Sequence, residues 1–579
     1  MTMLTKWGAA LDRSCPLPEY PRPQLRRESF YNLNGVWDYA VTPSGDEPEV
    51  WDGEIVVPFS PEAPLSGAAR GPAKDEYLHY RRGFTLPEGF QKSRVLLHFG
   101  AVDQIAEVFV NGVSAAKHSG GYWPFSADIT SLLREGENIL RVTVRDNADD
   151  PTFAYGKQRY KRGGMWYTAQ SGIWQTVWLE SVPDVYVKSL RITPEFDEAR
   201  VRIELETALE SSAAITCDVR AADGSFVAGS WAKGGVCVVP LPRFRAWSPD
   251  DPYLYTLDIT CGEDHVESYF AMRKFSYVEL GGHKVFGLNN APLFHNGLLD
   301  QGYYPDGLLT PPSDEAMVND IETMKRCGFN MLRKHIKIEP LRWYYHCDRL
   351  GMIVWQDMVS GGQPYSFLHV SALPTLGKVD LPDQDAKPYG RSGVLSRARF
   401  RREMADTVRL LYNCPCIALW TVFNEGWGQF DALDMANELK KLDPTRFIDH
   451  ASGWQDQGYE EMKSRHIYFR PVKLKNDGRA LALTEYGGYI LAVDGHRWTD
   501  KVFGYRICRD SAALAHDYEK LMLGQVLPHI RKDGLTAAVY TQITDVEEEL
   551  NGLMTYDREV LKIPEETLRE INAALRFDA

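Results

Sequence analysis

The amino-acid sequence predicts a multidomain protein that joins a β-sandwich of the jelly-roll type, an immunoglobulin-like β-sandwich and a (β/α)8 or TIM barrel. Three observations predict this fold class. The chain has 579 residues, which is too long for one hydrophobic core and indicates about two to four domains. Short strand patterns with turn signals fill the first half, whereas strand and helix patterns alternate in the second half. We expect domains at residues 1–182, 183–276 and 277–579.

The first expected domain, residues 1–182, consists of short strand patterns with almost no helical periodicity. Segments such as RVLLHFGAV and AEVFVNGVSAAKH are examples, and they read as short alternating strands. The second segment contains Asn111-Gly112, a pair that favours a tight hairpin turn. Many short strands of this kind indicate a β-sandwich or jelly roll.

The second expected domain, residues 183–276, is a smaller all-β unit. Its strand patterns include RVRIELETAL, AITCDVRAADG and LYTLDITCG. Their number and spacing are typical of an immunoglobulin-like sandwich. We expect the proline-rich segment LPRFRAWSPDDPYLY to be a connection inside this unit.

The third expected domain, residues 277–579, alternates strand and helix patterns. The segment SDEAMVNDIETMKRCG begins with Ser313 as a cap, has early acidic residues and ends on glycine, as a helix does. The strand pattern FNMLRKH follows it. Eight strand candidates run from APLFHNGLLD, the first, to LTAAVYTQITD, the last, with helical stretches between most of them. Eight such units in about 300 residues predict a (β/α)8 barrel.

Composition excludes several classes of function. The formal net charge is -14, whereas a nucleic-acid-binding surface is usually basic. We find no apolar run of signal-peptide or membrane-spanning length. Nine scattered cysteines suit reduced thiols, so we expect a cytoplasmic protein. Cys414 and Cys416 have no second pair at ligand spacing, and we expect neither a metal nor another cofactor.

Two predicted barrel strands end on a glutamate. Glu425 closes the fourth strand, CIALWTVFNEG, and Glu485 closes the seventh, LALTEYGG. Catalytic groups of such barrels lie at the carboxyl ends of the strands. Two facing carboxylates are what glycoside cleavage needs, one to protonate the leaving oxygen and one to attack the anomeric carbon or to activate water. The alternative is that each glutamate pairs with an arginine for stability.

The order of the domains and the motifs resembles glycoside hydrolase family 2, which holds β-galactosidases, β-glucuronidases and β-mannosidases. The resemblance covers nearly the whole chain, through LNGVWDYAV, SGIWQTVWLE, GFNMLRKH, FNEGWGQF and TEYGGY. It implies that Glu425 is the general acid/base and that Glu485 is the nucleophile of a retaining double displacement. It also implies that Asn424 binds the 2-hydroxyl of the sugar.

The resemblance implies further residues of the site. Arg333 matches an arginine that keeps the nucleophile ionised, and a neighbouring cation does lower a carboxylate pKa. Tyr468 falls where the family keeps a tyrosine beside the nucleophile, and Tyr540 falls where relatives often place a tryptophan below the sugar. Other polar or aromatic residues at predicted strand ends are expected to contact the sugar: His335, Asp357, Trp427, His450, Trp454 and His466.

Three departures from the family bear on the substrate. Trp166 stands where galactosidases and glucuronidases carry an aspartate, six residues before Gly172. Glu549-Leu550-Asn551 stands where glucuronidases carry an Asn-x-Lys motif. His335 lies one place earlier than the histidine of the family's Arg-x-x-His. In addition, the basic loop GKQRYKRGG, residues 156–164, could meet an acidic sugar through arginine contacts if it leans over the barrel, although a solvated loop is the simpler interpretation.

These observations predict a retaining, exo-acting glycoside hydrolase that removes a terminal, β-linked sugar, most often galactose in this family. Alternatives are a furanosidase for galactofuranose or arabinofuranose, a glycosidase for a uronic acid held without the usual motif, and a transglycosylase. A non-catalytic carbohydrate-binding protein is the alternative of another class. We expect a carbohydrate partner, no nucleic acid and no membrane, and a homo-oligomer is possible.

Overall fold

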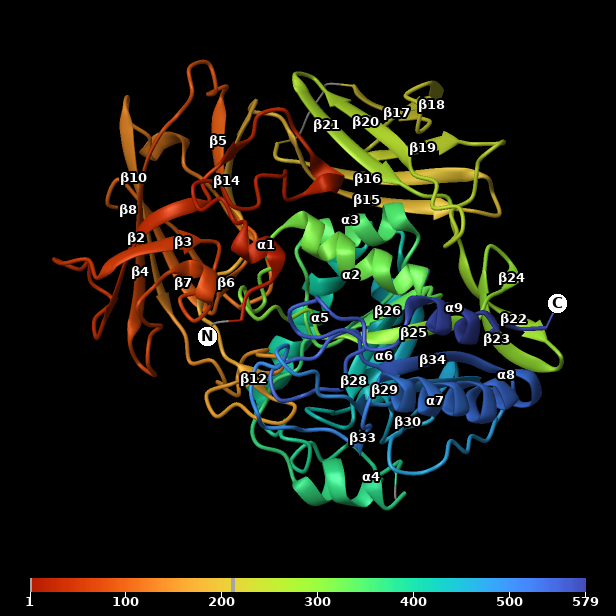
Figure 1. Cartoon of the computed structure of the whole chain (residues 1–579). Coiled ribbons are helices and arrows are strands. Elements are labelled where there is room, and N and C mark those ends of the chain that lie inside the picture. The colour runs from red at the N-terminus through yellow and green to blue at the C-terminus, as the bar shows by residue number, and fades with distance from the viewer. Residues whose placement is uncertain (1–2, 210–213, 378, 579) are drawn as a thin grey trace.

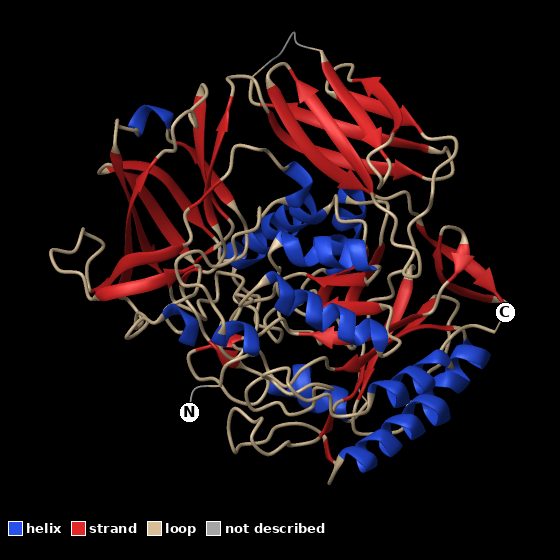
Figure 2. Ribbon diagram, turned by 45° about the horizontal axis from the view of Figure 1, so that its top comes forward, coloured by secondary structure: helices blue, strands red, loops and turns tan. Residues whose placement is uncertain are grey.

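The computed structural model describes residues 3–209, 214–377 and 379–578, and it confirms the predicted fold class. Figure 1 shows the jelly roll in red and orange at the left and the second sandwich in yellow-green at the upper right. The barrel lies below and between them. Figure 2 shows that the helices gather around the barrel, while the two sandwiches consist almost wholly of strands.

The jelly roll is built from two facing antiparallel sheets. Its six-stranded sheet has the order β3 (Gly53–Val57), β2 (Gly35–Thr42), β4 (Tyr77–Thr85), β10 (Glu137–Arg145), β7 (Ile105–Val110) and β8 (Val113–Ser119). Its four-stranded sheet has the order β1 (Tyr31–Asn32), β14 (Val177–Val182), β5 (Arg94–Phe99) and β9 (Phe125–Asp128). The predicted Asn111-Gly112 turn joins β7 to β8, and both residues have the positive φ that it requires, 51° and 82°.

The second sandwich packs a three-stranded sheet on a four-stranded one. The first sheet contains β15 (Val187–Glu195), β16 (Arg200–Thr207) and β19 (Val236–Pro240), and the second contains β18 (Phe226–Trp231), β17 (Ile215–Arg220), β20 (Tyr255–Cys261) and β21 (Asp264–Phe270). Strands such as β20 alternate buried and half-buried residues. This alternation places one face in the core of the sandwich.

Eight parallel strands form the barrel. Their order in the sheet is β29 (Phe447–Ser452), β28 (Ile417–Asn424), β27 (Ile353–Asp357), β26 (Met331–Lys334), β25 (His295–Asp300), β34 (Leu535–Thr541), β31 (Ala480–Gly487) and β30 (Met462–Ile467). β29 and β30 are neighbours, and the Ser464 hydroxyl of β30 donates to Asp449 of β29 at 2.9 Å. The strands are buried along their length because helices cover them on the outside.

The helices of the barrel domain are α2 (Asp314–Arg326), α3 (Leu341–Leu350), α5 (Val394–Leu411), α6 (Ala432–Leu442), α7 (Ser511–Leu521), α8 (Leu527–Asp533) and α9 (Glu565–Ala573). The predicted cap of α2 is confirmed, because the Ser313 hydroxyl accepts from the Ala316 amide. Two further helices are short: α1 (Lys6–Ala9) lies near the amino terminus, and α4 (Leu373–Thr375) lies in the connection between β27 and α5. Within the described residues, no helix has the length and apolar character needed to cross a membrane.

A small sheet covers the amino-terminal end of the barrel. It consists of β22 (Phe275–Leu280), β23 (His283–Leu288) and β24 (Ala291–Pro292). Phe286 of this sheet stacks on Phe447 at 4.2 Å between ring centroids and lies 5.9 Å from Trp355. Because side chains fill this end of the barrel, a substrate can enter only at the opposite end, where Glu425 and Glu485 lie.

The jelly roll packs directly on the barrel. Its Tyr122, Tyr155 and Trp174 are buried in the same hydrophobic core as barrel residues. The Tyr155 and Gly156 amides donate to the Ser360 carbonyl at 3.1 and 2.9 Å, just beyond the end of β27. The loop that follows Gly156, which includes β12 (Tyr167–Thr168), therefore lies at the carboxyl end of the barrel (Figure 1).

Candidate active site

The two predicted carboxylates are close together. Glu425 follows β28 in a left-handed conformation with φ 54°, and its amide donates to the Ser452 carbonyl at 2.9 Å. Glu485 lies within β31. An oxygen of each glutamate and a nitrogen of His466 all lie within 4.8 Å of one another. The structure thus brings three residues from three strand ends to one point.

Arg333 bonds directly to three of the predicted residues at the centre of the site and reaches a fourth, His335, through Asp357. It is fully buried, and its Nε donates to Asp357 Oδ1 at 3.0 Å. Its two Nη atoms donate to Glu485 Oε1 at 3.1 Å and to Asn424 Oδ1 at 2.8 Å. His335 Nδ1 lies 2.8 Å from the other oxygen of Asp357. A planar guanidinium suits this arrangement because its donors have fixed directions.

Arg333 and His335 together outweigh the effect of burial on the pKa of Asp357. Burial alone would raise the pKa of Asp357, but Arg333 and His335 hold it below its ordinary value. The pKa of His335 is itself lowered by burial, against the effect of Asp357. Asp357 is therefore a carboxylate that orients Arg333 and His335, and it is only 1% exposed.

Glu485 receives hydrogen bonds on both oxygens. Arg333 donates to Oε1, and the Tyr468 hydroxyl donates to Oε2. Tyr468 also lies 3.0 Å from the Thr541 hydroxyl and stacks on Tyr505 at 4.1 Å between ring centroids. Donors on both oxygens fix the position of the Glu485 carboxyl group.

Glu425 has a different environment. Burial raises its pKa, and the charges of Lys157, His335 and Arg333 offset this only in part. Its Oε1 lies 2.9 Å from His466 Nδ1. Burial lowers the pKa of His466 to about 3, so that this imidazole is neutral near pH 7.

His466 Nε2 lies between the Ser452 hydroxyl and Arg333 Nη1, which is 3.5 Å away, so its contacts admit both neutral tautomers. The Ser452 hydroxyl donates to Thr484 Oγ1 at 2.9 Å, and its oxygen lies 3.2 Å from His466 Nε2. If Nε2–H donates to Ser452, Nδ1 carries the lone pair and accepts a proton from Glu425. In this tautomer the proton between the two groups belongs to Glu425, which is the form of a general acid.

The predicted tryptophans line one side of this group. Trp427 is 5% exposed, and its amide donates to the Asn424 carbonyl at 2.9 Å, which closes the turn that contains Glu425. Its ring meets the ring of Trp166 edge to face at 5.0 Å. Trp454 is half-buried and lies 6.1 Å from the His466 ring. Trp166, which the sequence marked as a missing acid, is thus an aromatic neighbour of the site.

The structure places two predicted residues away from the carboxylates. His450 is buried against the loop that follows β29, where its Nε2 accepts from the Gln457 amide at 2.9 Å and lies 3.2 Å from Asp456. Tyr540 is fully buried and packs against Tyr518 of α7 at 5.2 Å. Since neighbouring residues of a strand point to opposite faces, the next residue along β34, Thr541, meets Tyr468 instead.

Sequence reasoning missed several residues of the site. Ser452, Thr484 and Thr541 contact residues of the candidate site through their hydroxyl groups, and Tyr505 stacks on Tyr468. A polar residue at the end of a predicted strand was an available signal for Ser452, Thr484 and Thr541. Tyr505 lies in a long connection between β31 and α7, and its sequence has no corresponding signal.

Among the residues that the structure describes, two groups have the spacing of metal ligands. One is Glu425, His466 and Glu485, and the other is His496, Asp557 and Glu559. In the first group the Arg333 guanidinium already lies 3.1 Å from Glu485. A second cation at this point would be repelled by that charge. The first group is therefore better suited to proton transfer and nucleophilic attack than to holding a metal.

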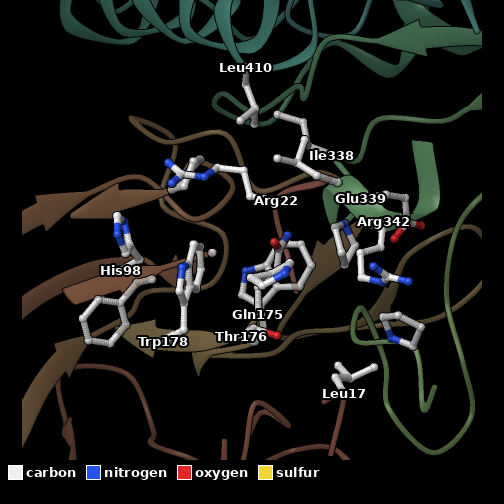
Figure 3. A pocket seen from close by; sticks show the side chains of 18 of the residues that line it. Leu17, Arg22, His98, Gln175, Thr176, Trp178, Ile338, Glu339, Arg342 and Leu410 are labelled. Carbon is white, nitrogen blue, oxygen red and sulfur yellow. The ribbon is translucent and has the colours of Figure 1, made fainter. Parts of the chain in front are cut away.

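A cavity of about 150 Å³ lies elsewhere, between the jelly roll, the amino-terminal segment and the start of α3. Figure 3 shows His98 and Trp178 on one side of it and Ile338 and Arg342 on the other. Neither Glu425 nor Glu485 lines it. This cavity is therefore separate from the candidate active site.

Three family models match consecutive parts of the chain. "Glycosyl hydrolases family 2, sugar binding domain" matches residues 64–183, "Glycosyl hydrolases family 2" matches residues 185–273, and "Glycosyl hydrolases family 2, TIM barrel domain" matches residues 311–473. The chain belongs to glycoside hydrolase family 2. The resemblance seen in the sequence is thereby confirmed.

Relatives within glycoside hydrolase family 2 differ in the sugar that they are named for. The chain is 25% identical over 387 residues to a β-galactosidase of Thermoanaerobacter pseudethanolicus, covering 63% of this chain and 47% of that one. It is 22% identical over 535 residues to a β-glucuronidase of Paenibacillus borealis, covering 82% and 85%. The chain spans about half the length or less of the first relatives that it matches.

Solved structures of family 2 proteins share the fold. A β-glucuronidase of an uncultured Clostridium sp. superposes with a TM-score of 0.74 at 19% identity, covering 95% of this chain and 98% of that one. A β-galacturonidase of Eisenbergiella tayi bound to galacturonate superposes with a TM-score of 0.71 at 18% identity, covering 96% and 100%. At this identity the likeness concerns the fold.

Proposed function

We propose that this member of glycoside hydrolase family 2 is a retaining β-glycosidase in which Glu485 is the nucleophile and Glu425 the general acid/base. The observation that carries the proposal is the contrast between two neighbouring carboxyl groups. Glu485 accepts hydrogen bonds from Arg333 and Tyr468, whereas Glu425 is buried beside a neutral histidine. Two neighbouring carboxyl groups in different environments can divide the acid and nucleophile roles in this way.

The separation of the carboxyl groups supports retention of configuration. Retaining enzymes hold the two groups about 5–5.5 Å apart, whereas inverting enzymes need about 6.5–9.5 Å to admit a water. Here an oxygen of Glu425 lies within 4.8 Å of an oxygen of Glu485. This short distance between oxygens supports direct attack by Glu485 on an anomeric carbon.

In the first step Glu425 donates its proton to the glycosidic oxygen while Glu485 attacks the anomeric carbon. The bond from that carbon to the leaving group breaks, and an ester bond to Glu485 forms. In the second step ionised Glu425 takes a proton from water, the water oxygen attacks the anomeric carbon, and Glu485 leaves as a carboxylate. Asn424 accepts from Arg333 through Oδ1, which orients its Nδ2 to donate to a sugar hydroxyl.

Relatives named for β-galactoside and β-glucuronide cleavage support a β-linked hexose or hexuronic acid as the terminal sugar. The presence of both carboxyl groups in working geometry speaks against a protein that only binds carbohydrate.

The proposal is tested with a panel of aryl β-glycosides and three variants, Glu485→Gln, Glu425→Gln and, as a control on an exposed residue of another loop, Glu460→Gln. Glu485→Gln should lose several orders of magnitude in kcat. Glu425→Gln should retain far more activity on a dinitrophenyl glycoside than on a phenyl glycoside, because a good leaving group needs no acid. Glu460→Gln should match the wild type.

The stereochemistry is read by proton NMR during the first minutes of hydrolysis. The β-anomer of the free sugar should appear first. An α-anomer formed first, or equal rates for the wild type and Glu485→Gln, would show that the assignment is wrong.

A further inference from the structure

We propose that the cavity between the jelly roll, the amino-terminal segment and the start of α3 is a binding site for a small, neutral aromatic molecule with one hydroxyl group, a phenol. The inference goes beyond the proposed function and does not depend on it. The cavity lies apart from Glu425 and Glu485, and its walls come from three segments that are distant in the sequence (Figure 3).

The size of the cavity limits the ligand to about one ring. Its volume is about 150 Å³, and an apolar cavity of that order holds a benzene-sized molecule. Pockets for drug-sized ligands usually measure about 300–1,000 Å³. An oligosaccharide is therefore excluded, whereas a single ring with one substituent fits.

The walls of the cavity are largely aromatic. Phe99, Tyr122, Trp174 and Trp178 line one side, and all four are buried. The polar atoms of three of them are bonded elsewhere: the indole of Trp174 donates to the Gly121 carbonyl at 2.7 Å, that of Trp178 to Glu180 at 3.2 Å, and the Tyr122 hydroxyl to the Tyr155 carbonyl at 3.3 Å. These rings have hydrocarbon left to offer the cavity, and aromatic rings pack well on one another.

The opposite wall is aliphatic. Met317 of α2, Ile338 before α3 and Leu410 of α5 line it, and Leu17 adds a side chain from the amino-terminal segment. Met317 and Ile338 are buried, whereas Leu410 is half-buried. A ring placed between the aromatic and the aliphatic wall would be removed from water on both faces, which is the main favourable term for an apolar ligand.

The acidic and basic side chains of the lining are paired within the protein. The Arg22 guanidinium donates to both oxygens of Glu180 at 2.9 and 3.0 Å. Arg342 Nε donates to both oxygens of Asp314 at 2.8 Å. Glu339 pairs with two buried lysines at 2.7 and 2.8 Å. Because these charges are already compensated, an ionic ligand would lose its hydration without gaining a free partner, so the site favours a neutral molecule.

Gln175 supplies a polar group without a partner. It lines the cavity and is half-buried, and its side chain has no hydrogen bond to any other described residue. Figure 3 shows it between Trp178 and Arg342. A carboxamide can both donate and accept, so one hydroxyl group on the ligand would satisfy it. This is the observation that favours a phenol over a plain hydrocarbon.

Occupation of the cavity should stabilise the packing of the jelly roll on the barrel. Trp178 belongs to β14 of the jelly roll, and Met317 belongs to α2 of the barrel domain. A ligand held between them binds the folded protein and not the unfolded chain. The melting temperature should therefore rise with the concentration of the ligand.

The test measures binding to the full chain by isothermal titration calorimetry with four probes of similar size: phenol, toluene, cyclohexanol and benzoate. Gln175→Leu removes the polar group, and Leu410→Trp fills the cavity from its half-buried side. The matched controls are Gln91→Leu and Leu376→Trp, which make the same substitutions at exposed positions. Ile338→Phe is a second filling variant, in case Leu410→Trp does not fold.

We expect phenol to bind the wild type at one site with a Kd below about 1 mM, well within the affinity that a ligand of this size can reach. Cyclohexanol and benzoate should each bind at least severalfold more weakly, the first because it lacks the aromatic ring and the second because of its charge. In Gln175→Leu the affinity for phenol relative to toluene should fall about 5- to 100-fold, because the hydroxyl is then buried without a partner. The filling variants should bind none of the probes, and the two controls should match the wild type.

Three results would overturn the inference. One is the absence of saturable phenol binding to the wild type, and another is unchanged phenol binding in a folded filling variant. The third is a ratio of phenol to toluene affinity that Gln175→Leu leaves unchanged, or tighter binding of benzoate than of phenol. Thermal melting with and without phenol checks the fold of each variant, and phenol should raise the melting temperature of the wild type and the controls but not of the filling variants.

Discussion

Arg333 should be irreplaceable even by lysine. Its guanidinium contacts Asp357, Glu485 and Asn424 at 3.0, 3.1 and 2.8 Å through three different nitrogens. A lysine retains the positive charge, but its donors all leave one atom. We expect Arg333→Lys to keep one of these contacts and to lose two.

The size of the effect follows from the contacts that are lost. A hydrogen bond to a charged group contributes about 1.5–3 kcal/mol, so two of them contribute about 3–6 kcal/mol. If this loss falls on the transition state, kcat declines by about 10²- to 10⁴-fold, because each 1.4 kcal/mol is about tenfold. Part of the loss will appear instead as a lower melting temperature, since Asp357 and Glu485 stay buried.

Arg446→Lys is the matched control. Arg446 is also buried, and it donates to Asp443 at 2.7 Å and to the Ile417 carbonyl at 2.8 Å, at the start of β28. Its replacement should lower the melting temperature and leave kcat near the wild-type value. Steady-state kinetics on an aryl glycoside and thermal melting test both variants. Equal losses of kcat in the two, or an Arg333→Lys enzyme within threefold of the wild type, would refute the role of the guanidinium.

Two further predictions concern pH. Burial raises the pKa of Glu425, and the charge of Lys157 opposes this shift. We therefore expect kcat/KM to decline at alkaline pH as Glu425 loses its proton, and Lys157→Met to move this decline to higher pH. A decline at lower pH in the variant would contradict the proposed effect of Lys157 on the pKa of Glu425. Burial raises the pKa of Asp103 in the jelly roll to about 7. The folded state therefore keeps a proton that the unfolded state releases near pH 4. As a result, the free energy of unfolding should fall as pH rises from about 4 to 7. Asp103→Asn retains an acceptor for Gln158 and should show a smaller drop in melting temperature between pH 5 and pH 8 than the wild type; an unchanged drop would contradict this assignment.

Sequence reasoning predicted the architecture and the two carboxyl groups because both follow from local patterns. A buried strand that ends on a glutamate stands out, as Glu425 and Glu485 do, and parallel barrel strands bring their carboxyl ends together. The side on which a strand residue lies is harder to predict. The ladder between β31 and β34 changes register between Leu483 and Tyr486, and Tyr540 faces the helices while Thr541 faces Tyr468.

Contacts between distant segments were beyond the reach of pattern reasoning. His450 lies at a strand end as expected, but its imidazole contacts Asp456 and Gln457 of the following loop instead of the site. In the sequence, Glu549 indicated only that the Asn-x-Lys motif of glucuronidases is missing. Its position depends on Tyr167, which is 382 residues earlier in the chain, and no local periodicity reports such a partner.

Glu547, Glu548 and Glu549 of the barrel accept hydrogen bonds from Thr168, Gly164 and Tyr167 of a jelly-roll loop, and this contact has a consequence for how such enzymes diversify. A barrel separated from its amino-terminal neighbour would keep Glu425 and Glu485 but would lose Lys157, Tyr167 and Trp166 from their surroundings. Substrate preference can therefore change through exchanges in an accessory domain while the reacting groups stay as they are. For enzyme engineering, the loop at residues 156–168 offers a place to alter selectivity without touching the machinery of bond cleavage.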